Sequence, residues 1–122
     1  MAGKKFDKGK PRWDLVPWSG LHSFVAVLTH GADKYGEHNW KELAGGRERY
    51  FAAALRHLLA WKEGELLDPD SGLRHLGHAI CNLVFLAWFD DHGYPEDVPD
   101  SREGESPGYL GPDNYDERDG KK

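Results

Sequence analysis

The chain has 122 residues, 30% charged residues, a formal net charge of −5 and one cysteine. This length predicts one domain, and the lone Cys81 excludes an internal disulfide and fits a buried, inert thiol in a reducing compartment. Because no apolar run could cross a bilayer and no apolar segment follows the charged N-terminus, we expect a cytoplasmic protein without a secretory signal.

Residues 1–18 are predicted to form a basic, irregular arm, in which prolines argue against a helix. Trp13 and Trp18 are too apolar for a free tail, so we expect the arm to lie on the folded body. An acidic chain with a basic arm is a poor candidate for binding duplex DNA, but the arm suits a small anion such as a nucleotide phosphate. The alternative is a solvated tail whose lysines aid solubility.

Residues 19–92 are predicted to form an all-α, antiparallel bundle of about three main helices. The first helix opens near Ser19, and Gly31 is expected to kink or break it. The segment after it is typical either of a ligand-binding loop or of a turn anchored by aromatic rings. Its polar and aromatic residues are Lys34, Tyr35, His38, Asn39 and Trp40.

The second and third helices are expected over residues 47–64 and 72–90, with Ser71 as the N-cap of the third. Their short connection makes them antiparallel neighbours. The third helix carries an apolar stripe at helical spacing, which predicts a wide buried face: Leu76, Ile80, Leu83, Val84 and Ala87.

Three large apolar residues lie off this stripe: Phe85, Trp88 and Phe89. Exposing them on a monomer would leave a large apolar patch, so we expect a homo-oligomer, a dimer or higher, packed through the third helix. Residues 93–122 are acidic and rich in proline and glycine, which predicts an extended tail. Its tyrosines and Leu110 are spaced like anchors that dock either on the folded body or on a neighbouring subunit: Tyr94, Tyr109, Leu110 and Tyr115.

Histidines and carboxylates gather at the predicted junction of the second and third helices. His75, His78 and Asn82 share one helix face, and His57 can approach them from the second helix. We predict His57, His75 and His78 as catalytic groups, because imidazoles exchange protons near neutral pH. Carboxylates favour Mg²⁺ or Mn²⁺, and the predicted metal ligands are Glu65, Asp68 and Asp70. The alternative is a set of helix-edge histidines beside a turn and an N-cap.

A second group of residues suits a nucleotide, since arginine and lysine bind phosphate and aromatic rings stack on bases. Trp13 and Trp61 are further rings that could stack a base. The predicted nucleotide-binding residues are Lys10, Arg12, Lys34, Tyr35, Asn39, Trp40, Arg56 and Asn82. The chain contains no P-loop, no GxGxxG after a strand and no GxSxG motif.

Three runs carry a family resemblance over about residues 6–87: FDKGKPRWDLVPW, VLTHGADKYGEHNW and YFAAALRHLLAWKEGELLDPDSGLRHLGHAICNLVFL. They resemble the phage-type family of dATP/dGTP diphosphohydrolase N-terminal domains, which looks related to the all-α, MazG-like nucleoside triphosphate pyrophosphatases. The resemblance implies hydrolysis of purine (deoxy)nucleoside triphosphates to monophosphate and pyrophosphate with Mg²⁺ or Mn²⁺, in dimers or tetramers, in the host cytoplasm for a phage protein.

The sequence departs from the MazG-like pattern in its metal-binding motifs. MazG-like enzymes hold their metals with ExxE and ExxD, whereas His75 and His78 stand where the second acidic pair is expected. Two hypotheses therefore stay open. One is a metal-dependent hydrolase, and the other is a non-catalytic oligomer that binds and sequesters a nucleotide or a nucleotide-derived signal.

Overall fold

The computed structural model describes residues 2–95, which form three α-helices and three short 3-10 helices. The α-helices are α1 (His22–Tyr35), α2 (Gly46–Lys62) and α3 (His75–His92). The 3-10 helices are η1 (Trp13–Leu15), η2 (Trp18–Leu21) and η3 (Asn39–Glu42). Within residues 2–95 the only β-type pairing is an isolated bridge between Leu67 and Arg74. The prediction of an all-α protein is therefore confirmed.

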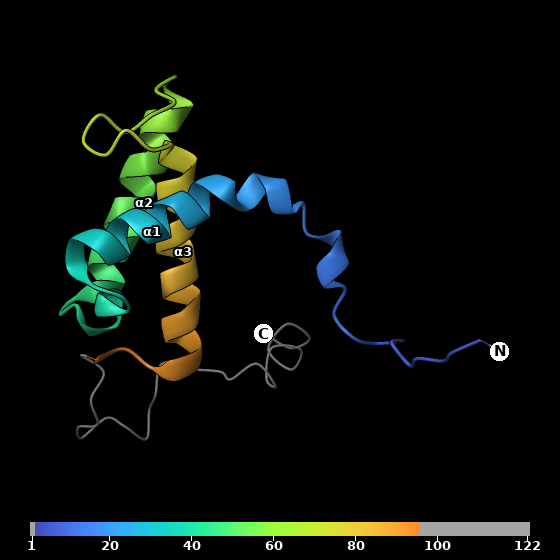
Figure 1. Cartoon of the computed structure of the whole chain (residues 1–122). Helices are drawn as coiled ribbons and strands as arrows, with labels where there is room; N and C mark the ends of the chain where they lie inside the picture. Colours follow the sequence, from blue (N-terminus) through green and yellow to red (C-terminus); the bar gives the residue numbers. More distant parts are fainter. Residues whose placement is uncertain (1, 96–122) are drawn as a thin grey trace, which may run out of the picture.

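The central element is α3, which packs against both α1 and α2. Figure 1 shows α2 running beside α3 while α1 crosses it. The crossing is close: a Cβ atom on Gly77 of α3 would lie 2.5 Å from the carbonyl oxygen of Ser23 on α1. Cys81 is buried in this core, so the prediction of a buried cysteine is confirmed, and burial raises the pKa of its thiol to about 12.

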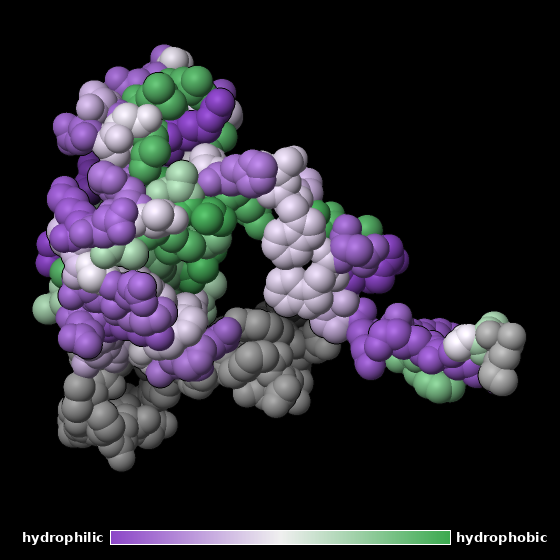
Figure 2. Space-filling view, in the orientation of Figure 1, coloured by the Kyte–Doolittle hydropathy of each residue, from purple (hydrophilic) through white to green (hydrophobic). Residues whose placement is uncertain are grey.

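The buried face of α3 differs from the predicted one. Leu83 and Val84 are 48% and 43% exposed, and Ala87 is also exposed. Other residues of α3 are buried instead, among them Gly77, Ala79 and Phe89, and the missing side chain of Gly77 lets the backbone of α1 approach. This leaves apolar side chains on the outside of the bundle, and Figure 2 shows them gathered over α3 below α1.

Three predicted features of the helix boundaries were wrong. The first α-helix begins at His22 rather than near Ser19, because Trp18–Leu21 form η2. Gly31 does not break α1, which runs on to Tyr35 and ends at Gly36 with a positive φ of 99°. The third helix begins at His75 rather than near residue 72, since the preceding segment forms the bridge to Leu67. Arg74, not Ser71, occupies the N-cap position, and the Ser71 side chain has other partners.

The expectation that the N-terminal arm lies on the body was also wrong. Figure 1 shows the arm leading away from the bundle. Phe6, Trp13 and Trp18 are 82%, 69% and 54% exposed. The pairing of charged side chains along the arm is local, as in the ion pair between Arg12 and Asp14 at 2.8 Å, so it does not tie the arm to the helices.

At the other end of the described chain, Tyr94 docks on α3 as predicted. Its ring stacks on Phe89 with centroids 4.8 Å apart, and its hydroxyl lies 3.3 Å from the carbonyl oxygen of Leu86. The other predicted anchors, Tyr109, Leu110 and Tyr115, lie outside the described residues, as does most of the predicted tail 93–122. None of the described helices has both the length and the hydropathy that a membrane span requires.

Candidate imidazole–carboxylate site

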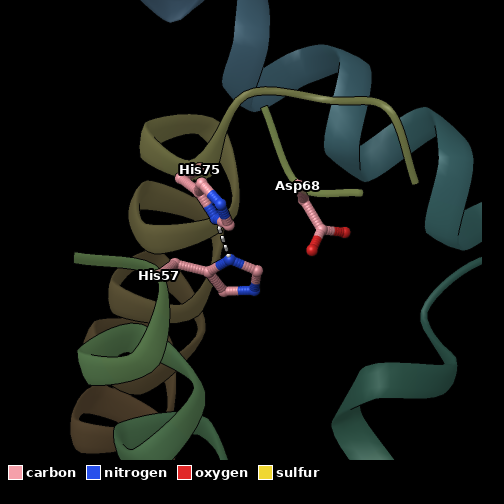
Figure 3. Close-up of side chains that lie close together, drawn as sticks. All are labelled: His57, Asp68 and His75. Carbon is pink, nitrogen blue, oxygen red and sulfur yellow. Dashed lines mark hydrogen bonds between the residues drawn. The ribbon is translucent and has the colours of Figure 1, made fainter. Parts of the chain in front are cut away.

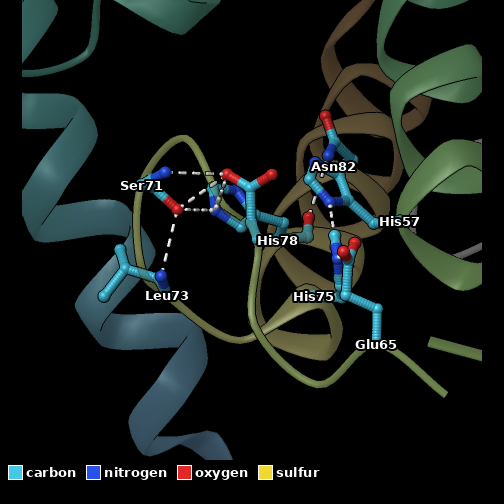
Figure 4. A network of polar contacts seen from close by, with 8 residues as sticks. His57, Glu65, Ser71, Leu73, His75, His78 and Asn82 are labelled. Carbon is cyan, nitrogen blue, oxygen red and sulfur yellow. Dashed lines mark hydrogen bonds and ion pairs between the residues drawn. The ribbon is translucent and has the colours of Figure 1, made fainter. Parts of the chain in front are cut away.

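A cluster of polar side chains lies where α2 ends and α3 begins. His57 comes from α2, His75 and His78 come from the first turn of α3, and the connection between the helices supplies the remaining members. Because the two helices are antiparallel neighbours, the connection folds back beside their facing ends (Figure 4). We call these six residues the imidazole–carboxylate cluster: His57, Glu65, Asp68, Ser71, His75 and His78.

The centre of the cluster is His75, which is only 3% exposed and uses both ring nitrogens. Its Nε2 lies 2.7 Å from Oε1 of Glu65, and its Nδ1 lies 2.9 Å from Nδ1 of His57. A carboxylate only accepts, so Nε2 of His75 donates to Glu65. With Nδ1 of His57 donating in turn to His75, Nε2 of His57 keeps its lone pair on the side of the ring that faces Asp68 (Figure 3).

Ser71 joins the second carboxylate to the third imidazole. Oδ2 of Asp68 accepts from the Ser71 backbone N–H at 3.0 Å and from Oγ at 2.9 Å. Oγ also accepts from the backbone N–H of Leu73 at 3.1 Å and lies 2.8 Å from Nε2 of His78. A hydroxyl has one proton, which goes to the carboxylate, so Nε2 of His78 must donate to Oγ. This arrangement leaves Nδ1 of His78 as its acceptor nitrogen.

The environment keeps two of the imidazoles neutral and the Asp68 carboxylate charged. Burial lowers the pKa of His57, helped by the nearby His78, and burial also lowers the pKa of His78, although Asp68 partly opposes this. For Asp68, burial acts to raise the pKa, but hydrogen bonds from the Ser71 hydroxyl and N–H outweigh it and hold the pKa below its usual value. The rings of His57 and His78 stack in parallel, with centroids 4.4 Å apart.

Three members of the cluster have the geometry to share a metal ion. One ligand atom each from His57, Asp68 and His75 all lie within 4.8 Å of one another, as Figure 3 illustrates. Glu65 is not part of this group and instead accepts a hydrogen bond from Nε2 of His75. Asp70, which was predicted as a ligand together with Glu65 and Asp68, is exposed and lies outside the group of three.

The sequence matches a known family along most of its length. The family described as "dATP/dGTP diphosphohydrolase, N-terminal" matches residues 1–98. The chain belongs to this family. The resemblance seen in the sequence is therefore confirmed, while the relation to MazG-like enzymes stays a prediction.

One relative of this diphosphohydrolase-family chain is a protein of Salmonella phage PMBT28 called dATP/dGTP diphosphohydrolase. The two are 34% identical over 110 residues, which cover 84% of this chain and 37% of the relative. The chain thus spans just over a third of the length of the relative that it matches. No solved structure matches the chain.

Several predicted nucleotide-binding residues lie away from the cluster in this family member. Lys10 and Arg12 are on the projecting arm, where Arg12 pairs with Asp14. Lys34 and Tyr35 form the last turn of α1, with the ammonium of Lys34 5.1 Å from the Tyr35 ring centroid. Asn39 is exposed at the start of η3.

Trp40 is a packing anchor of the bundle. Its ring stacks on Phe85 with centroids 4.2 Å apart and planes 7° apart, and it meets Phe89 edge-on at 5.6 Å. The hydroxyl of Tyr50 donates to the Trp40 carbonyl oxygen at 2.8 Å. The sequence of this segment is typical either of a ligand-binding loop or of a turn anchored by aromatic rings, and these packing contacts match the anchored turn. Asn82 also faces inward, where its amide nitrogen donates to the carbonyl oxygen of His78 at 2.8 Å.

Two residues of interest were missed by the sequence analysis. The sequence predicts Ser71 as a helix cap, yet it bridges Asp68 and His78. Arg74 is the second: the tetrapeptide Leu-Arg-His-Leu occurs twice, at 55–58 and 73–76, and places Arg56 directly before His57 and Arg74 directly before His75. This short repeat is the sequence feature that points to Arg74.

Arg56 and Arg74, the arginines of the two Leu-Arg-His-Leu segments, are both exposed. Arg56 lies close enough to His57 to contribute to its lowered pKa. Arg74 borders an open hollow of about 340 Å³ between the start of α1 and the connection, lined also by His22, Ser23, Ala26, Leu67, Gly72 and Leu73. Of the predicted phosphate-binding cations, Arg56 is thus the one that the described structure brings beside the cluster.

Proposed function

We propose that this chain acts in the metal-dependent hydrolysis of purine deoxynucleoside triphosphates to the monophosphate and pyrophosphate. The observation that carries the proposal is the imidazole–carboxylate cluster, in which three histidines and two carboxylates converge at one end of the bundle. The relative's name, dATP/dGTP diphosphohydrolase, supports the substrate class. Membership in a family named for the same activity supports the reaction.

In this reaction a water oxygen attacks the α-phosphorus, the bond from that phosphorus to the bridging oxygen breaks, and pyrophosphate leaves. The water loses a proton, and we assign its acceptance to Nδ1 of His78. Nε2 of His78 is held by Ser71, and the lowered pKa keeps the ring neutral near pH 7, as a general base requires.

The other residues of the cluster hold the divalent ion and the phosphates. His57, Asp68 and His75 fit an ion, because their ligand atoms lie close together. A bound Mg²⁺ or Mn²⁺ supplies charge neutralisation at the phosphate oxygens. Arg56 and Arg74 are exposed beside two of the histidines, where forked guanidinium groups suit phosphate oxygens.

The proposal also includes a homo-oligomer. Leu83 and Val84 leave an apolar face on the outside of α3, and the arm carries the exposed Trp13 and Trp18. Such surfaces are typical of interfaces between protein subunits. A second copy that covers the α3 face gives these side chains partners that the single chain does not.

The direct test is incubation of the protein with dGTP or dATP in Mn²⁺ or Mg²⁺, with the products separated by ion-exchange chromatography. We expect monophosphate and pyrophosphate in equal amounts, and a chelator should abolish both. His78→Gln should lower kcat by about 10²- to 10⁴-fold, which is the usual contribution of a positioned base. His22→Gln, an exposed histidine outside the cluster, is the matched control.

A different product pattern would contradict the proposal. Triphosphate that stays intact in every metal, yet raises the melting temperature of the protein, would point to a sequestering protein instead. Release of inorganic phosphate, with a nucleoside diphosphate left behind, would place the cleavage at another bond.

A further inference from the structure

The facing imidazoles of His57 and His75 have the spacing of two ligands on one metal ion. Their Nδ1 atoms lie 2.9 Å apart. Imidazole nitrogens bind first-row metals at about 2.0–2.1 Å, so two such ligands at 90° to 109° lie roughly 2.9–3.3 Å apart. The same two atoms can therefore share either a proton or a metal ion.

The Asp68 carboxylate supplies a third ligand on the same side. One oxygen of Asp68 and one ring nitrogen from each of His57 and His75 lie within 4.8 Å of one another, and Figure 3 shows the carboxylate directed into the space beside the His57 ring. Ligands on opposite sides of one ion are separated by about 4.2 Å, twice the bond length, so a small closure brings all three into range. Ser71 already fixes the carboxylate with two hydrogen bonds.

The surroundings of the two rings are those of an oriented metal ligand. A metal-bound histidine usually donates its other ring N–H to a carboxylate or a carbonyl, which fixes its tautomer. His75 does so to Glu65 at 2.7 Å. The ring of His57 is held in place by the parallel ring of His78, with the two planes 8° apart. Both rings are thus positioned before any ion arrives.

On these contacts, and resting on the proposed function for its role, we infer that His57, Asp68 and His75 form a binding site for a first-row transition-metal dication, with selectivity over Mg²⁺. Two nitrogens and one oxygen suit Mn²⁺, Fe²⁺, Co²⁺ or Zn²⁺, whereas Mg²⁺ prefers an all-oxygen shell. Three protein ligands leave coordination positions open for a water and a phosphate oxygen.

The experiment measures metal binding without substrate. Chelator-treated full chain is titrated with Co²⁺, Mn²⁺, Zn²⁺ and Mg²⁺ by calorimetry, and the Co²⁺ complex is followed by its visible absorption bands. We expect one Co²⁺ per chain, with an affinity at least about tenfold above that for Mg²⁺. His57→Gln and Asp68→Asn should each weaken Co²⁺ binding by about 10-fold or more and change the absorption bands.

Two variants serve as matched controls. Asp70→Asn alters an exposed carboxylate two residues from Asp68, and His22→Gln alters an exposed imidazole, so both should keep the wild-type affinity. Circular dichroism of each variant separates lost ligands from lost folding.

Two outcomes would overturn the inference: no stoichiometric Co²⁺ binding by the wild type, or binding that His57→Gln leaves unchanged. Either result together with triphosphate hydrolysis in Mg²⁺ would refute this metal site, and with it the assignment of the ion to these three residues, while the proposed reaction stands. Transition-metal binding as expected, but without hydrolysis, would do the reverse.

Discussion

The Nδ1 atoms of His57 and His75 face each other at 2.9 Å across the junction of α2 and α3. One ring is almost completely buried and the other is half-buried, and Glu65 accepts from the far side of His75. Two protonated Nδ1 atoms could not meet at this distance, since one of them must accept. The junction is therefore built for imidazoles that are not all charged.

This arrangement predicts that the protein loses stability in mild acid. The pKa of His57 and of His78 is lowered in the folded chain from the ordinary 6.5, so below that pH the unfolded chain binds more protons. The stabilisation is complete above about pH 6.5 and is lost as the pH falls toward the folded pKa values. The pKa of Asp68 is lowered from 3.8 in the folded chain, so its contribution to stability is lost only as the pH falls below 3.8.

The measurement is the melting temperature of the chelator-treated protein from about pH 7.5 to about pH 5.5. The wild type should lose melting temperature over this range, and the double variant His57→Gln/His78→Gln should show a shallower slope. His22→Gln should follow the wild type. Equal slopes for the wild type and the double variant would show that these rings do not drive the acid sensitivity.

The close approach of α1 and α3 makes a second prediction. A methyl group at Gly77 would lie 2.5 Å from the carbonyl oxygen of Ser23, so Gly77→Ala must push the two helices apart. We expect a loss of about 1–3 kcal/mol in the free energy of unfolding, as for other overpacked cores. Urea denaturation followed by circular dichroism measures it.

Gly31→Ala is the matched control, because nothing lies within 4 Å of the added Cβ atom in the middle of α1. Alanine there should raise stability by about 0.5–1 kcal/mol, since glycine is the poorer helix former. A Gly77→Ala variant as stable as the wild type would show that the helices do not cross this closely.

Much of the junction could be predicted from the sequence because its determinants are local. The spacing of His75 and His78 fixes their common side of a helix, and a short connection leaves few ways to place His57 other than beside them. The same reasoning put Glu65 and Asp68 near the imidazoles. The bridging role of Ser71 depends on how the connection bends after Leu67, which residue spacing does not reveal.

The rest could not be predicted because it depends on long-range packing. The side of α3 that is buried was decided by where small residues allow close approach, and the apolar stripe alone pointed to Leu83 and Val84. The arm looked too aromatic to be exposed, but its apolar residues do not indicate which surface they would pack against. Trp40 suited either a base or a protein ring, and only the fold supplied Phe85.

Ser71 is predicted to act as a positioning residue for the proposed reaction. Ser71→Ala removes the hydroxyl that donates to Asp68 and accepts from His78, so the pKa of the Asp68 carboxyl should rise and His78 should lose its fixed tautomer. We expect a lower kcat with a shifted pH profile. Ser71→Thr, which keeps a hydroxyl, should restore most of the rate. A change in KM alone, with an unaltered pH profile, would contradict this role.

Trp40 is predicted to matter for stability rather than for nucleotide affinity. Its ring packs on Phe85 and Phe89, so Trp40→Ala should cost about 3–5 kcal/mol in the free energy of unfolding, whereas Trp40→Phe should cost less. Phe6→Ala, at a site 82% exposed, is the control and should change little. An unchanged melting temperature for Trp40→Ala, combined with weaker nucleotide binding, would instead support the base-stacking interpretation.

The apolar outer face of α3 leads to the prediction for subunit assembly. Leu83 and Val84 expose nearly half of their surface, and burying them against a second copy is favourable by about 25 cal/mol per Å² of apolar area. The double variant Leu83→Ser/Val84→Ser should therefore shift a dimeric or larger wild type toward monomer in size-exclusion chromatography with light scattering. Val25→Ser, which alters a residue 52% exposed on α1, should keep the wild-type mass. A monomeric wild type at micromolar concentration would refute the homo-oligomer, and an unchanged mass for the double variant would move the interface to another face.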